Sequence, residues 1–183
     1  VIADATSNPA FVAADLLSQA EHGPDSQVIL VSDNESMIKQ TIIEIDQQMM
    51  SLARKTIAEL ALKNSVSILL ESPEACVDFS NLYAPEHLII ATESAEGLID
   101  KVVNAGSVFL GNYSCESAGD YASGTNHTLP TNGYSRMFSG VSLASFQKQI
   151  TYQKLTKTGL KNIGPAIETM AEAEGLHAHK NAV

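Results

Sequence analysis

The sequence predicts an α/β fold: a largely parallel sheet with flanking helices, followed by a small helical C-terminal appendage. Short apolar runs alternate along the chain with segments whose apolar residues recur at helical spacing, a pattern typical of βαβ units. After residue 141 the alternation stops, and helical segments follow without an obvious sheet partner. We therefore expect an α/β portion over residues 1–134, carrying most candidate site residues, and a mostly helical appendage over residues 135–183.

The elements of the first half follow from helix caps and apolar spacing. The chain opens in a strand, and Asn8 and Pro9 are typical of a helix N-cap and first helical position. This helix is expected to reach His22, because Gly23 and Pro24 cannot continue it. The elements expected next are a strand at 27–31, helices at 34–50 and 52–62, and a strand at 66–70.

The second half continues the alternation up to residue 110 and then changes character. Strands are expected at 88–90 and 107–110, with helices at 73–83 and 95–103. The Gly-, Ser- and Asn-rich region 111–140 predicts a long ordered loop, and long loops in compact domains are often functional. In the tail we expect a strand near Ile150 and helices from about residue 158 onward.

Composition narrows the class of protein. Apolar residues make up 44% and charged residues 17%, which argues against a disordered or collagen-like chain. The net charge of -10 argues against a nucleic-acid partner, and no apolar run approaches the roughly 20 residues of a membrane span. Two cysteines, Cys76 and Cys115, cannot form a disulfide framework, so we expect a reducing intracellular setting.

The chain begins at Val1 in what resembles a strand, with no initiator Met and no signal-peptide pattern. We interpret it as a fragment of a longer protein.

Several polar residues could carry chemistry, although each has a structural alternative. Gln19 and His22 share one face of the first helix, and the spacing alone favours a histidine bonded to a nearby carbonyl over a ligand site. Glu86 and His87 lie at the end of a strand, where an acid and an imidazole could address one cavity or a solvated turn.

The remaining candidates lie in the Gly-rich region and at the C-terminus: Asp120, His127, Glu174, His177 and His179. Taken together, the His, Asp and Gln side chains are suitable ligands for one zinc ion. The chain contains neither G-x-G-x-x-G nor G-x-x-x-x-G-K-[ST], so it offers no evidence for a dinucleotide site of its own.

Five motifs resemble the histidinol dehydrogenase family, in order and with matching spacing along the whole chain. They are QAEHGPDS at 19–26, YAPEHL at 83–88, NAGSVFLG at 104–111, GDYASGTNHTLPT at 119–131 and AEGLHAH at 173–179. The matched region corresponds to the C-terminal two-fifths or so of a typical member, which agrees with the fragment interpretation.

The resemblance implies incomplete Rossmann-like domains and a zinc-dependent homodimer with a shared active site. It also implies NAD-linked oxidation of L-histidinol to L-histidine in two steps through an enzyme-held aldehyde, the end of histidine biosynthesis. The NAD contacts would lie outside this chain, and the fragment alone would be inactive. A cytoplasmic location follows, or a plastid one if the source is a plant.

Site residues carried over by the resemblance fall into three groups. The catalytic pair would be Glu86 and His87. The zinc ligands, which also contact substrate, would be Gln19, His22, Asp120 and His179, and further substrate contacts would come from His87, His127 and Glu174.

Two other functions stay open at this point. One is a zinc hydrolase in which Glu86 serves as base for a metal-bound water. The other is a non-catalytic metal-binding or oligomerisation module. NADH formation separates both from a dehydrogenase.

Overall fold

The computed structural model describes residues 1–183 and divides them into two compact units, Val1–Ser145 and Phe146–Val183. The division falls somewhat later in the chain than the boundary expected at 134/135.

The N-terminal unit is built on one five-stranded sheet whose strands all run parallel, in the order β3-β2-β1-β4-β5. This confirms the predicted fold class. The strands are β1 (Ile2–Ala3), β2 (Ile29–Ser32), β3 (Val66–Leu69), β4 (His87–Ala91) and β5 (Ser107–Leu110). The central strands are buried on both faces, as expected of a sheet covered by helices on each side.

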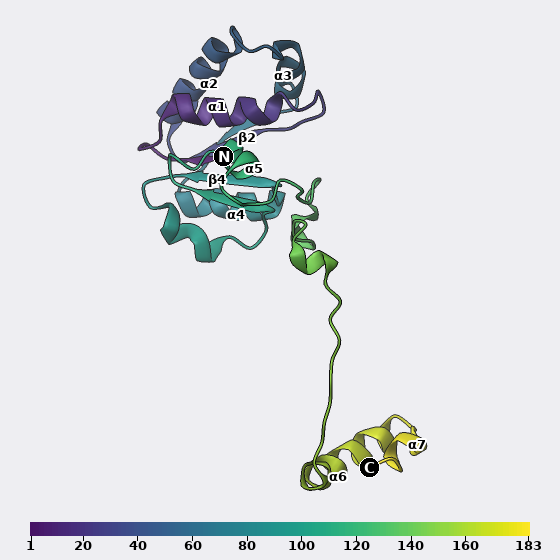
Figure 1. The fold of residues 1–183 in the computed structure, drawn as a ribbon. Coiled ribbons are helices and arrows are strands. Elements are labelled where there is room, and N and C mark those ends of the chain that lie inside the picture. Colours follow the sequence, from purple (N-terminus) through teal and green to yellow (C-terminus); the bar gives the residue numbers. More distant parts are fainter. The chain divides into compact units, whose positions relative to one another are not determined.

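Helices cover the two faces of this sheet (Figure 1). One face packs against α1 (Pro9–Ala20), α2 (Glu35–Met49) and α3 (Lys55–Leu62). The other packs against α4 (Pro73–Tyr83) and the 3-10 helix η1 (Ala95–Lys101). Successive residues of one strand serve opposite faces: Ile89 packs with α1, whereas Leu88 and Ile90 pack with α4.

Polar caps set where several helices begin. The side chains of Asn8, Asn34 and Ser72 accept hydrogen bonds from the first-turn backbone N–H groups of α1, α2 and α4. Because these caps are local, the starts of the helices were predicted well from sequence. The end of α1 was not: the helix stops at Ala20, and Gln19 and His22 are joined by a turn instead.

Two further expectations differ from the structure. The predicted loop 111–140 contains the helix α5 (Glu116–Tyr121) and the short 3-10 helix η2 (Tyr134–Arg136). The strand expected near Ile150 is wrong, because residues 147–156 form neither helix nor strand. Apolar alternation there has no neighbouring strand with which its backbone could pair.

The C-terminal unit contains α6 (Lys157–Ala173) and α7 (His177–Lys180), after the short 3-10 helix η3 (Leu143–Phe146) at the boundary. Thr156 caps α6, and Gly175 follows it in the left-handed region with φ of 71°. An ion pair joins Lys180 to Glu172. The C-terminal unit is therefore mostly helical where it has regular secondary structure, as predicted for the tail.

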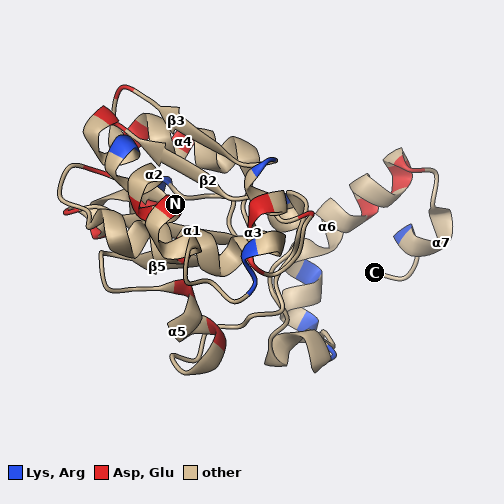
Figure 2. Ribbon diagram, turned by 90° about the horizontal axis from the view of Figure 1, so that it is seen from above, with Lys and Arg blue, Asp and Glu red and all other residues tan.

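Two surface properties follow from the composition. Acidic residues outnumber the basic ones, which lie scattered over the fold (Figure 2). None of the helices combines the length and apolar character that a bilayer crossing requires.

Candidate functional site

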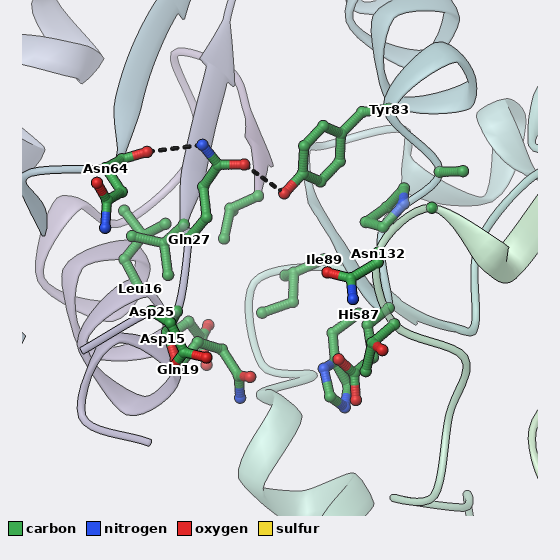
Figure 3. A pocket seen from close by; sticks show the side chains of 18 of the residues that line it. Asp15, Leu16, Gln19, Asp25, Gln27, Asn64, Tyr83, His87, Ile89 and Asn132 are labelled. Carbon is green, nitrogen blue, oxygen red and sulfur yellow. Dashed lines mark hydrogen bonds between the residues drawn. The ribbon is translucent and has the colours of Figure 1, made fainter. Parts of the chain in front are cut away.

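The candidate site borders a cavity of about 850 Å³ in the N-terminal unit. Figure 3 shows Gln19 and Asp15 of α1 on one side and His87 on the other. The lining also includes Glu86 and the residues just before β2, so the cavity lies at the amino ends of the strands. Open α/β sheets more often bind ligands at the carboxyl ends. Here Glu86 and His87 lie at the start of β4, so the candidate site is at the amino-terminal edge of the sheet.

A tight connection holds Glu86 and His87 in place. Helix α4 ends at Ala84 in the left-handed region with φ of 57°, and the chain turns at once into β4. The backbone N–H of Ser107 donates to the Glu86 carbonyl at 2.9 Å. A Cβ at Gly106 would lie 2.4 Å from that same carbonyl, so only glycine permits this close approach.

Three acid–base side chains converge on this edge. His87 Nε2 lies 3.7 Å from Glu116 Oε1 and 4.0 Å from Asp120 Oδ1. Each of these three residues offers one atom that could bind a metal ion, and the three atoms lie within 4.8 Å of one another. Glu116 and Asp120 are one turn apart on α5, so they share a helix face. The Phe109 ring packs against the His87 imidazole in a tilted arrangement, with the ring centroids 6.1 Å apart.

Burial shifts the protonation of these groups. Burial, together with the neighbouring Asp120, raises the pKa of Glu116 to about 7. Burial also raises the pKa of Glu86 and lowers the pKa of His87. A neutral His87 imidazole near neutral pH is able to accept a proton.

Three buried polar atoms in this site lack a hydrogen-bond partner: Gln19 Nε2, His87 Nε2 and Glu116 Oε1. Buried polar groups are normally satisfied, so a cluster of unpaired atoms indicates a place where a ligand or a small rearrangement completes the bonding. An amide such as Gln19 can also turn its oxygen toward a cation.

The structure gathers most of the predicted site residues around this edge. In addition to burial, His22 lowers and Asp120 raises the pKa of both Glu86 and His87, and His127 lowers the pKa of His87, as expected of neighbouring charged groups. Glu174 and His179 lie in the C-terminal unit, Glu174 at the end of α6 and His179 on α7. Their roles remain predictions, as do those of the other residues.

Glu116 was missed by the sequence analysis. In the sequence, only its spacing of four residues from Asp120 could have pointed to Glu116. Such spacing places two side chains on one face of a helix, but this region was predicted to be a loop. Burial of a carboxyl with 2% exposure is visible only in the folded unit.

Comparisons with known proteins agree along the whole chain. The histidinol dehydrogenase family profile matches residues 1–183. The histidinol dehydrogenases of Bacteroides fragilis (strain YCH46) and Colwellia psychrerythraea are 56% and 57% identical over all of this chain, which spans 43% and 42% of those proteins. A crystal structure of histidinol dehydrogenase from Elizabethkingia anophelis superposes with a TM-score of 0.96 at 66% identity, over 99% of this chain and 42% of that one. The chain therefore belongs to the histidinol dehydrogenase family and spans about two-fifths of its relatives' length.

Proposed function

We propose that the protein containing this chain is a zinc-dependent histidinol dehydrogenase, which oxidises L-histidinol to L-histidine in two NAD-linked steps at the end of histidine biosynthesis. One observation carries the proposal. In a chain matched by the family from end to end, Gln19, Glu86 and His87 line one cavity, and Asp120 Oδ1 lies 4.0 Å from His87 Nε2. An acid, a base and oxygen ligands for a cation are the groups that such a reaction needs.

The donor set is suitable for zinc. Gln19, His22 and Asp120 would supply an amide oxygen, an imidazole nitrogen and a carboxylate oxygen, and His179 a second imidazole. The unpaired Gln19 Nε2 supports this assignment only through a turn of the amide, which would exchange nitrogen and oxygen and bring the oxygen to the position that has no partner. When bound, zinc would provide a Lewis-acidic anchor for the amine and imidazole nitrogens of the substrate.

His87 is the proposed base in both oxidations. Its lowered pKa keeps the imidazole neutral near neutral pH, so it accepts the proton of the substrate hydroxyl while hydride leaves to NAD. The Phe109 ring limits the orientations available to the imidazole.

Glu86 has a different proposed role, at the aldehyde stage. Its carboxyl accepts a proton from water as the water adds to the aldehyde carbon, which gives the hydrate oxidised in the second step. Burial raises the pKa of Glu86, and this strengthens the carboxylate as a base. An aldehyde kept within the site is protected from side reactions.

The remaining parts of the enzyme are proposed to come from elsewhere. The NAD contacts lie outside this chain, which carries no dinucleotide fingerprint. We assign the delivery of Glu174 and His179 to the second subunit of a homodimer, an arrangement that a C2 dimer would make twice.

Single-turnover NADH formation in the complete enzyme, started separately from histidinol and from the aldehyde, tests these roles. His87→Asn is expected to slow both oxidations by about 10² to 10⁴, the usual contribution of a positioned acid–base group. Glu86→Gln is expected to slow the aldehyde oxidation more than the first hydride transfer.

Glu96→Gln on the exposed side of η1 is the matched control and should leave both rates unchanged. Equal slowing of both oxidations by Glu86→Gln, with His87→Asn without effect, would contradict the assignment. Hydrolytic activity without any NADH formation would instead favour a zinc hydrolase.

A further inference from the structure

Glu116 is a buried carboxyl that none of the roles above uses. Its side chain is 2% exposed, whereas Ser117 and Tyr121 of the same helix are exposed. A carboxyl with so little access to water is costly to maintain unless its oxygens have partners. One oxygen, Oε2, has a partner in the Ser18 hydroxyl of α1 at 3.4 Å, and the other, Oε1, has none.

The unpaired oxygen faces an unpaired nitrogen. Glu116 Oε1 is 3.7 Å from His87 Nε2, and both atoms are buried without a hydrogen bond. The separation is slightly beyond hydrogen-bond length, and hydrogen bonds of catalytic groups are often long until substrate is bound. A small movement of the Glu116 side chain would satisfy both atoms at once.

We propose that Glu116 is a positioning residue for His87: its carboxylate accepts the Nε2–H of the imidazole and so leaves the Nδ1 lone pair as the base. This inference rests on the proposed function of His87. Orientation of a catalytic imidazole by a buried carboxylate on its second nitrogen is a general arrangement in enzymes.

Asp120 is the competing partner, and the geometry disfavours it. Its Oδ1 lies farther from Nε2, at 4.0 Å, and its side chain is more exposed, at 15% against 2% for Glu116. Asp120 is also a proposed zinc ligand, so its oxygens have another use. The Ser18 hydroxyl lies 3.4 Å from the far oxygen of Glu116, and the near oxygen faces His87.

The kinetic test uses the complete enzyme with Glu116→Leu, which removes the acceptor while filling the space. We expect kcat to fall by about 10² to 10⁴ in both oxidations, as when an orienting carboxylate is removed from a catalytic histidine, with KM and zinc content unchanged. Glu116→Gln should lose less, because its amide oxygen can still accept Nε2–H. Glu71→Leu, at an exposed site, is the matched control.

A second measurement does not depend on activity. Long-range ¹H–¹⁵N spectra of the complete enzyme, without substrate, should show His87 with the proton on Nε2. An Nδ1–H tautomer in the unaltered enzyme would overturn the proposal, and so would an unchanged kcat in Glu116→Leu. Loss of zinc with activity restored by added zinc would also overturn it, because Glu116 would then hold the metal. If the complete enzyme forms no NADH from histidinol, the proposed function fails, and the tautomer alone decides the role of Glu116.

Discussion

Replacing Gly119 by Ala tests whether the close packing of α5 on β5 determines the position of the site. Gly119 lies between Glu116 and Asp120 on α5 and is buried against Phe109. An added Cβ would meet two ring atoms of Phe109 at 2.5 and 2.9 Å and the Thr125 hydroxyl at 2.6 Å. Phe109 in turn contacts the His87 imidazole, so the ring cannot move without disturbing the site.

Two effects oppose each other in this substitution. Ala is a better helix former than Gly by about 0.8–1.0 kcal/mol, whereas overpacking of a buried contact costs about 1–3 kcal/mol. Carbon atoms pack at about 3.5–4.0 Å, so the new methyl would be roughly 1 Å too close to a buried ring. Since the ring is 7% exposed and packed in the core, we expect the overpacking cost to lie in the upper part of its range, about 2–3 kcal/mol. After subtraction of the gain in helix propensity, the net loss is about 1–2 kcal/mol. For a chain of this size the melting temperature should fall by roughly 2–8 °C.

Thermal and urea denaturation of the 183-residue chain measure the effect. Gly97→Ala in η1 is the control, because its Cβ would meet only the movable Ser94 hydroxyl, at 2.9 Å. Phe109→Leu is destabilising by itself but should reduce the added cost of Gly119→Ala, giving a coupling energy in a double-mutant cycle. Equal or greater stability of Gly119→Ala, or strict additivity with Phe109→Leu, would refute the steric reasoning.

Four further outcomes are expected. Burial raises the pKa of Asp15 from 3.8 to about 6, so the stability it contributes is full below pH 3.8 and is lost as pH rises through about 6. Asp15→Asn should therefore gain in free energy of unfolding relative to the unaltered chain between about pH 4 and pH 7 in urea titrations, and a pH-independent difference would contradict this. The His22→Ala, Asp120→Ala double variant of the complete enzyme should lose its zinc in elemental analysis; unchanged zinc would exclude the proposed ligand set. Mixing inactive His22→Ala and His179→Ala enzymes should restore some activity, and no recovery after verified subunit exchange would count against a shared site. The purified 183-residue chain should form no NADH from histidinol, and turnover comparable to that of the complete enzyme would show that the chain is sufficient.

The sequence by itself determined the architecture of the N-terminal unit. Caps such as Asn34 and Ser72, and apolar runs such as 88–90, act over a few residues, so they can be recognised without knowing what packs against them. The same locality explains why the parallel sheet was predicted correctly. The motifs around Glu86 and His87 also identified the family, because long, unusual strings of residues carry information that periodicity does not.

Only the tertiary structure decided how the site is assembled. The α5 helix is short and lies in a Gly-rich region, so its local signal is weak, and it forms by packing Gly119 on Phe109. The burial of Glu116 and its approach to His87 join residues 29 positions apart along the chain. The prediction of a strand near Ile150 was wrong because a strand needs a neighbouring strand to pair with its backbone, and the local sequence does not say whether the fold supplies one. Local signals fix where elements begin, whereas contacts between distant residues fix which side chains share a cavity.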